Sequence, residues 1–282
     1  MQNPIMQARL ACDSPHNFYW PWGADPTAID ESLVTGSGKM LLLDRLIPRL
    51  LDGGHKILIF SQFKTQLDLL QDWATQLRDW YCCRIDGAIS QADRHAQITA
   101  FNTSPKHKIF LLSTRAGGQG INLVAADTVI LFDSDWNPQQ DLQAQDRAHR
   151  IGQTKPVIVY RLATKGTVEQ TLLEKADSKR RLERLVIQTG KFKSLLDSGA
   201  SANQNSDVDD LKKALGGNEF ERFEAGPDPS SILSEKDLDI LTDRSEEAYV
   251  RAEKGLEQSG PAFLAVETKR DGKGIMSEIA GK

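Results

Sequence analysis

The sequence is poor in cysteine and has no long apolar run. Its 282 residues include only three cysteines, Cys12, Cys82 and Cys83, and an odd count with two neighbours is a poor basis for a disulfide framework. This cysteine usage suits a reducing compartment. No apolar stretch approaches the roughly 20 residues that span a bilayer, and the first residues lack the charged start and apolar run of a signal peptide. We therefore expect an intracellular, soluble protein with no membrane contact.

An excess of charge of one sign is also missing. The chain has 35 lysine and arginine residues against 39 aspartate and glutamate residues, for a formal net charge of −4. Such a chain is not a basic nucleic-acid wrapper, so contact with a polyanion must come from a local basic patch. Cys12 and His16 are four residues apart, but no second pair of ligands accompanies them. A zinc site is therefore not expected.

The usual means of holding a nucleoside triphosphate are absent as well. Gly36–Met40 imitates a P-loop but departs from the GxxxxGK[ST] template, because position 33 is leucine and Met40 has no hydroxyl for magnesium. Lys39 is instead expected to begin a helix. No acidic Asp-Glu box follows a predicted strand. These residues thus offer no independent way to hold magnesium and the β- and γ-phosphates.

Strand-like and helix-like segments alternate through the middle of the chain. Short apolar runs predict strands at 56–60, 81–85, 109–112, 128–132 and 157–162, and helical spacing predicts helices at 39–51, 65–77, 91–101, 139–149 and 167–186. This alternation indicates a single α/β lobe with a parallel sheet covered by helices on both faces. Ligands are then expected at the carboxyl ends of the strands, where the loops after Phe60, Leu112 and Phe132 converge.

Changes in composition divide the chain into three regions. Residues 1–37 are aromatic and contain several prolines, and are expected to form an irregular segment that packs against the rest. Residues 38–193 hold the alternating pattern. Residues 194–282 are expected to form a linker, short helices and a disordered tail. Within them, a short helix is predicted at 207–215, and the capping-box-like Ser234–Asp237 would start a helix over 238–249.

A glycine-bearing segment, 113–123, follows the predicted strand 109–112. The hydroxyls of Ser113 and Thr114, with nearby backbone amides, could hold a nucleic-acid phosphate. The glycines could instead only relieve steric crowding in a tight turn. Gly118–Leu123 begins as the dinucleotide motif GxGxxG, but leucine replaces the third glycine, so a dinucleotide site is not expected.

Arg147 and Arg150 lie three residues apart, on one face of the segment if it is helical. Two guanidinium groups behind a backbone-exposing loop could neutralise charge that develops on a transferring phosphoryl group. The alternative is a solvated basic helix end with surface ion pairs. Gln143, His149 and Gly152–Gln153 crowd around the arginines, and this favours the functional interpretation.

Asp133–Pro138 follows the predicted strand 128–132. Trp136 could be buried under the next helix or could form an aromatic contact with a nucleic acid, and composition does not decide between the two. Asp133 and Asp135 have no acid–base partner at a useful spacing. The mixed charges of the predicted helix 167–186 are typical of a solvated face.

Several of these segments together resemble a known family. Lys56–Gln62, Ser113–Leu123, Asp133–Pro138 and Asp141–Thr154 are similar, in order, to motifs of the C-terminal RecA-like lobe of Swi/Snf-type chromatin-remodelling motors. The similarity runs from about Gly38 to Lys193, and Arg-Ile-Gly-Gln at 150–153 is highly specific for this type. Residues 11–19, 185–193 and 233–245 resemble the lymphoid-specific helicase branch.

The resemblance implies a DNA-dependent ATPase of the nucleus that translocates on duplex DNA within nucleosomes and uses ATP with magnesium. It implies arginine fingers at Arg147 and Arg150, and a brace helix from Thr167 that crosses back to a first lobe. Nucleotide contacts are implied at Gly120, Asn122 and Gln143. DNA contacts are implied at Ser61, Gln62, Ser113, Thr114, Gly118 and Trp136.

One departure from the family is large. The first RecA-like lobe, with its P-loop lysine and magnesium ligands, is missing from this sequence. We therefore expect a fragment that is inactive alone and needs a first lobe in cis or in trans. The alternative is a non-catalytic DNA- or partner-binding module that uses the same surface. A third possibility, an RNA-directed helicase, is disfavoured by residues 150–153.

Overall fold

The computed structural model of the chain describes residues 3–19, 28–114, 121–148, 153, 155–174, 233–253, 259–260 and 263–264. The chain divides into two compact units, Met1–Glu224 and Ala225–Lys282. The predicted boundary between residues 193 and 194 lies outside the described residues and stays a prediction.

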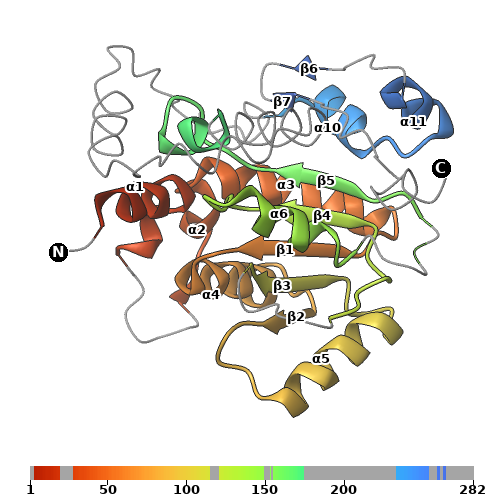
Figure 1. Cartoon of the computed structure of the whole chain (residues 1–282), viewed down its shortest axis with the longest axis horizontal. Coiled ribbons are helices and arrows are strands. Elements are labelled where there is room, and N and C mark those ends of the chain that lie inside the picture. Colours follow the sequence, from red (N-terminus) through yellow and green to blue (C-terminus); the bar gives the residue numbers. More distant parts are fainter. Residues whose placement is uncertain are drawn as a thin grey trace, which may run out of the picture. The chain divides into compact units, whose positions relative to one another are not determined.

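A five-stranded sheet forms the centre of the first unit (Figure 1). Its strands lie in the order β2-β3-β1-β4-β5, and every neighbouring pair is parallel. The bounds are β1 (Ile57–Ser61), β2 (Cys82–Ile85), β3 (Ile109–Ser113), β4 (Thr128–Leu131) and β5 (Ile158–Arg161). Each predicted strand is therefore confirmed to within one or two residues, and so is the parallel sheet.

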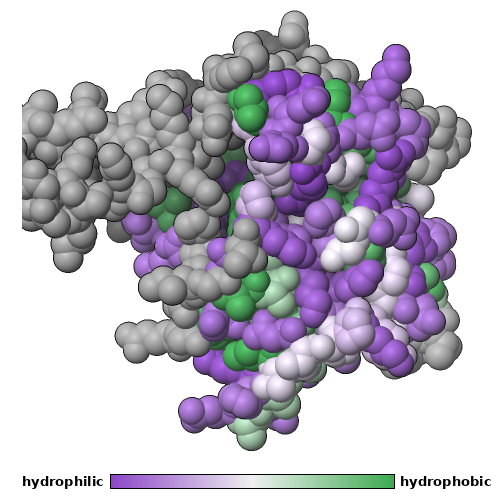
Figure 2. All heavy atoms as spheres, turned by 90° about the vertical axis from the view of Figure 1, so that its right-hand side faces the viewer, coloured by the Kyte–Doolittle hydropathy of each residue, from purple (hydrophilic) through white to green (hydrophobic). Residues whose placement is uncertain are grey.

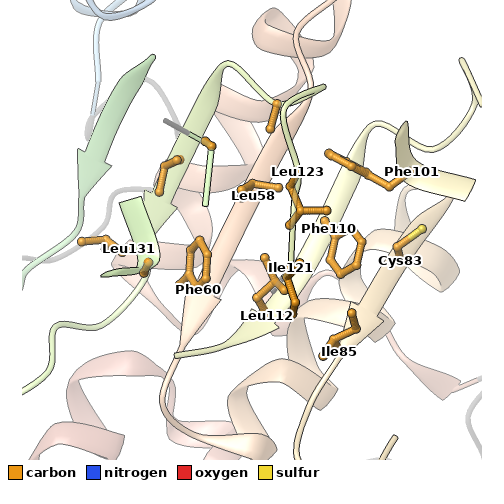
Figure 3. Packing of buried hydrophobic residues seen from close by; sticks show 14 residues of the cluster. Leu58, Phe60, Cys83, Ile85, Phe101, Phe110, Leu112, Ile121, Leu123 and Leu131 are labelled. Atoms are coloured by element: carbon orange, nitrogen blue, oxygen red, sulfur yellow. The ribbon is translucent and has the colours of Figure 1, made fainter. Parts of the chain in front are cut away.

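One face of the sheet carries a dense apolar core. Alternate strand residues point to the same face, so Phe60, Phe110 and Leu112 meet there, with Ile121 and Leu123 from the segment before β4 (Figure 3). The helices α5 (Gln91–Thr103) and α6 (Pro138–Gln145) contribute further buried side chains to this core. The segment after the glycine-bearing loop thus covers the sheet instead of standing free in solvent.

The opposite face is covered by α3 (Gly38–Asp52) and α4 (Lys64–Asp72) (Figure 1). Buried leucines and isoleucines of α3 follow the helical spacing from which this helix was predicted. The predicted helix 65–77 is α4 together with a π-helical turn at Trp73–Leu77. Trp73 of this turn is fully buried, and its indole donates to Asp44 of α3 at 2.9 Å. The expectation of helices on both faces is confirmed.

The expectation that residues 1–37 are irregular is wrong. They contain the helices α1 (Pro4–Asp13) and α2 (Ser32–Thr35) and the short turn η1 (Pro15–Asn17). Pro4 begins α1 and Pro15 begins η1, because proline fits the first helical turn, where no backbone donor is needed. Asn3 and Ser14 cap α1 and η1 through their side chains.

The start of α3 decides the meaning of the P-loop-like sequence. Ser37 caps the helix by accepting from the backbone N–H of Met40. Lys39 lies in the first turn and is buried. The expectation that Lys39 begins a helix is confirmed, and its ammonium group is enclosed within the protein.

In the second unit, the predicted helix 238–249 is replaced by two helices, α10 (Glu235–Thr242) and α11 (Glu246–Glu253). The capping box is confirmed, with Ser234 and Asp237 bonded reciprocally. Asp243 adopts an extended backbone and ends α10, and Ser245 then accepts from the N–H of Ala248. The strands β6 (Ser259–Gly260) and β7 (Phe263–Leu264) pair antiparallel.

Two predicted helices are only partly covered by the structure. Residues 168–174 are helical, as predicted for 167–186, and the rest of that helix and the helix predicted at 207–215 lie outside the described residues. Among the described helices, none has the length and apolar character needed to cross a membrane. On the face shown in Figure 2, hydrophobic residues form small islands between hydrophilic ones.

Candidate functional site

The loops after β1, β3 and β4 meet at the carboxyl edge of the sheet, as the sequence predicts. The N–H of Thr114 donates to the carbonyl of Ser61 at 3.1 Å, which joins the ends of β3 and β1. Asp133 joins the ends of β1 and β4, because its carboxylate accepts from the Ser61 hydroxyl and from the N–H of Gln62 at 3.0 Å. Asp133 therefore organises this edge, a role that its spacing in the sequence did not suggest.

Asp133 is fully buried, and burial raises its pKa. The Ser61 hydroxyl, Lys39, the Gln62 N–H and Arg9 favour the ionised form and oppose that effect. The carboxylate is thus surrounded by donors, as a buried charge requires.

The predicted DNA-contact residues differ in their exposure. Trp136 is 36% exposed, and Gln62 and Ser113 are half-buried, whereas Ser61 is 0% exposed. Thr114 is 5% exposed, and neither its hydroxyl nor the Nε2 atom of Gln62 has a hydrogen-bond partner among the described residues. Gly118 lies outside the described residues. Orphaned polar atoms at an edge of this kind are groups that a bound ligand could satisfy.

Helix α1 packs onto the same edge. The guanidinium of Arg9 donates to the carbonyl of Ser134 at 2.6 Å and lies 3.9 Å from an oxygen of Asp133. It also lies over the ring of Phe63, 5.2 Å from the centroid. Arg9 is 4% exposed, so its charge is held within the protein by these partners.

Lys39 is the centre of a second buried cluster. Its Nζ donates to Asp13 at 2.7 Å, to Glu169 at 2.5 Å and to the carbonyl of Phe132 at 2.9 Å. Burial would lower the pKa of Lys39, but the two carboxylates outweigh it and hold that pKa above its ordinary value. Burial raises the pKa of Asp13 well above its ordinary value, against the opposing effect of Lys39. The lysine stays charged, and Asp13 is the carboxyl that gains a proton readily.

Asp13 leads to a prediction about pH. A carboxyl with a raised pKa in the folded state favours unfolding as pH rises, because the unfolded chain ionises first. The free energy of unfolding of the natural chain, relative to that of Asp13→Asn, should therefore fall as pH rises above 3.8, the ordinary pKa of this group. Urea unfolding at a series of pH values measures the difference, and a difference that is flat or rises with pH would contradict the assignment.

The segment with the arginines begins with a firmly held helix. Asn137 caps α6, and Asp141 in its first turn is 1% exposed. The carboxylate of Asp141 accepts from the N–H of Asp135 at 3.0 Å and pairs with Arg161 of β5 at 3.3 Å. Burial raises the pKa of Asp141, and Arg161 opposes this. These contacts fix α6 over β5.

The predicted helix 139–149 ends early. Within it, α6 stops at Gln145, and Arg147 lies in the tight turn that follows. The N–H groups of Arg147 and Ala148 donate to the carbonyls three residues earlier, which is the narrower 3₁₀ pattern. The N–H of Leu123 donates to the Arg147 carbonyl at 3.4 Å. The turn after α6 is thus bonded to the segment that precedes β4.

This turn brings the first predicted arginine finger beside the predicted nucleotide-contact segment. Leu123, bonded to Arg147, directly follows Asn122, whose side chain is exposed and whose carbonyl accepts from Asn102 at 3.0 Å. Gln143 is exposed on α6. Gly120 and Arg150 lie outside the described residues, and all five assignments stay predictions.

Gln153 fastens the same two segments together. Its Nε2 donates to the carbonyls of Val124 at 3.1 Å, Ala126 at 2.6 Å and Ala148 at 3.3 Å. Its Oε1 accepts from the N–H of Lys155 at 2.9 Å. The sequence marked Gln153 only as a neighbour of the arginines, because its acceptors are backbone atoms about 5 to 29 residues away.

The Gln153 amide gives a second prediction. Gln153→Glu replaces the donating nitrogen with an oxygen facing three carbonyls, so the free energy of unfolding should fall by about 1–3 kcal/mol. Chemical unfolding measures this loss. Gln143→Glu, at an exposed position of α6, is the matched control and should change stability by less than about 0.5 kcal/mol. Equal stability of the two variants would exclude the proposed bonds.

The described residues include no group of three or more His, Cys, Asp or Glu side chains placed to hold a metal ion. Near the C-terminal ends of the strands, the carboxylate of Asp13 binds Lys39, and the carboxylate of Asp133 binds a backbone N–H and lies close to Arg9. The donor set in this part of the chain therefore does not fit a magnesium site.

Comparisons with known proteins agree with this geometry. Residues 38–152 match the family described as helicase conserved C-terminal domain. The human lymphoid-specific helicase is 49% identical over 251 residues, and the ISWI chromatin-remodeling complex ATPase ISW2 of Saccharomyces cerevisiae is 45% identical over 246 residues. This chain contains the helicase C-terminal domain of Swi2/Snf2-type chromatin-remodelling ATPases.

Solved structures show the same fold for this helicase domain. The C-terminal part of the Fun30 ATPase domain superposes with a TM-score of 0.50 at 41% identity, covering 52% of this chain and 47% of that one. The Sulfolobus solfataricus SWI2/SNF2 ATPase core, solved in complex with dsDNA, gives a TM-score of 0.56 at 31% identity, covering 74% of this chain and 40% of that one. The fold is therefore RecA-like.

The helicase domain is only a part of its relatives. The alignments cover 87% of this chain, but 29% of the human lymphoid-specific helicase and 21% of ISW2.

Proposed function

We propose that this chain supplies the arginine-bearing lobe of a DNA-dependent ATPase that moves duplex DNA in nucleosomes. ATP with magnesium would lie between this lobe and a second lobe that carries a P-loop. The proposal depends above all on the bond between the Leu123 N–H and the Arg147 carbonyl. That bond joins the turn that carries Arg147 to the segment that carries Asn122, and this supports a role of both residues at one nucleotide.

In this proposal, duplex DNA contacts the carboxyl edge of the sheet. Trp136 and Gln62 offer surface there, and the Thr114 hydroxyl and the Gln62 amide are donors that phosphate oxygens could accept. Ser61 contributes through the loop that it holds with Asp133, because its own side chain is enclosed. The archaeal relative solved with dsDNA supports this choice of ligand. Nuclear localisation and nucleosomal partners follow from the relatives and belong to the same proposal.

Hydrolysis by this chain alone should be negligible. Its 282 residues contain no GxxxxGK[ST] sequence, and its described residues hold no metal-binding cluster. Lys39, the lysine of the P-loop-like sequence, forms buried ion pairs with Asp13 and Glu169. The phosphates and magnesium must therefore be held by a different lobe.

A complementation experiment tests the proposal. A P-loop lobe from a relative is added to this chain, and ATP hydrolysis is measured with and without duplex DNA. We expect DNA-stimulated hydrolysis only in the mixture, with its loss in Arg150→Ala. DNA-stimulated hydrolysis by this chain without any other would overturn the proposal.

The missing P-loop favours one second candidate, a non-catalytic DNA- or partner-binding module. Hydrolysis that never appears in the mixture, together with retained DNA binding, would support that reading. In either case binding to duplex DNA should be weak and should fall steeply with salt concentration, because phosphate contacts release counterions. Competition between RNA and duplex DNA distinguishes an RNA-directed helicase.

A further inference from the structure

Two segments outside the family match at residues 38–152 meet on one side chain inside it. Asp13 ends α1, and Glu169 lies in the helix at residues 168–174. Both carboxylates bind Nζ of Lys39, and all three residues are at most 6% exposed. Lys39 thus binds a segment before the helicase match and a segment after it at a single buried atom.

Asp13 and Glu169, the two carboxylate partners of Lys39, each accept a further hydrogen bond from a neighbouring residue. The Ser37 hydroxyl donates to the Asp13 carbonyl at 2.6 Å, and the N–H of Thr164 donates to Glu169 at 2.9 Å. The Thr164 hydroxyl donates to the carbonyl of Cys12 at 3.4 Å, so the two segments also touch directly. The carboxylates are therefore placed by the backbone and do not reach Lys39 on flexible, exposed side chains.

The third bond of Lys39 leads to the DNA-facing edge. Its Nζ donates to the Phe132 carbonyl and lies 5.3 Å from the centre of the Phe132 ring. The next residue is Asp133, which holds Ser61 and Gln62, and Arg9 of α1 bonds the carbonyl of Ser134. Residues 132–134 are thus bound on one side by Lys39 and on the other by Arg9.

We propose that Lys39 is a positioning residue that makes α1, the helix at 168–174 and the 132–134 loop move as one body. The helix at 168–174 is the start of the segment that the family resemblance describes as a brace towards the other lobe. A displacement of that helix would then be transmitted to the loop that carries Trp136 through two hydrogen bonds. Only this last consequence rests on the proposed function, because the mechanical coupling itself needs neither DNA nor nucleotide.

The ion pairs of Lys39 with Asp13 and with Glu169 can be removed one at a time by substitution. Asp13→Asn leaves Lys39 paired with Glu169, and Glu169→Gln leaves it paired with Asp13. Each variant keeps one ammonium with one carboxylate, so neither leaves a lone buried charge. Lys39→Met cuts both connections at once, and Lys106→Met at an exposed position is the control.

Amide hydrogen exchange on the 282-residue chain tests the coupling. Asp13→Asn should raise exchange about tenfold to a hundredfold at residues 4–13, and Glu169→Gln should raise it at 168–174. Under the proposal, each single variant also raises exchange at 132–137, while the central strands β1 and β3 stay as protected as in the natural chain. The control should change none of these regions.

Two results would overturn the proposal. One is an increase in hydrogen exchange that is confined to the mutated segment and leaves residues 132–137 unchanged. The other is an equal increase in hydrogen exchange in every element, which indicates only lower global stability. The affinity for duplex DNA, measured for the same single variants, then distinguishes the coupling through Lys39 from the proposed DNA-dependent function. If hydrogen exchange at residues 132–137 changes but neither the natural chain nor any variant binds DNA, the proposed function is wrong and the coupling through Lys39 still holds.

Discussion

Replacing Arg147 with alanine is expected to lower DNA-stimulated ATP hydrolysis by roughly 10³–10⁵-fold when a P-loop lobe is present. The guanidinium lies in the turn that the Leu123 N–H and the Gln153 amide hold in place. An alanine there keeps the backbone bonds, since both acceptors are carbonyls, and removes the guanidinium group with its charge. Initial rates of phosphate release from the mixed lobes measure the effect.

The controls for Arg147→Ala separate charge from structure. Arg94→Ala, on α5 beside the edge strand β2, removes the same group far along the sheet from β4 and should leave the rate within about twofold. Arg147→Lys keeps the charge but loses the planar fork, and should recover only part of the rate. Full activity of Arg147→Ala, with normal unfolding behaviour, would exclude the arginine-finger role.

Lys39→Met should produce the largest loss of stability of any single change described for this chain, about 3–5 kcal/mol. Methionine fills much of the lysine's volume, so the loss does not come from a cavity. It comes from Asp13 and Glu169, which remain buried without their cation. Urea unfolding at neutral pH, followed by tryptophan fluorescence to which the buried Trp73 contributes, measures it.

The pH dependence of Lys39→Met identifies the cause. Without the ammonium, the buried carboxyl of Asp13 has a pKa raised still further, so the free energy of unfolding of the variant should rise as pH falls from neutrality towards the ordinary carboxyl range. The deficit relative to the natural chain should therefore shrink on acidification. A deficit of the same size at every pH would indicate a packing defect and not uncompensated charge.

Much of the fold could be predicted from local pattern. The strands β1, β3 and β4 each contain three or four consecutive buried apolar residues, and a strand covered on both faces is recognisable from such a run alone. Convergence of the loops after Phe60, Leu112 and Phe132 follows from the parallel order of the sheet. The rejection of a P-loop at Gly36–Met40 rested on two wrong residue types and is consistent with the enclosed Lys39.

What could not be predicted depends on partners far apart in the sequence. Nothing near Lys39 announces that Asp13 and Glu169 bind it, since they lie 26 and 130 residues away. The early end of α6 at Gln145 is marked by no glycine or proline within the predicted helix 139–149. The helices in residues 1–37 were missed because the aromatic, proline-containing composition of this segment was taken as irregular, although Pro4 and Pro15 each begin a helical element. The roles of the site residues are still predictions from the family resemblance.

The packing of α1 bears on how this domain should be handled in the laboratory. A recombinant chain cut at the limits of the family match, 38–152, would discard Arg9, Asp13 and Glu169 together. It would expose the face of the Phe63 ring that Arg9 covers and would leave the Lys39 ammonium without its two carboxylate partners. The family match at 38–152 is thus shorter than the stretch that supplies the buried partners of Lys39 and Phe63.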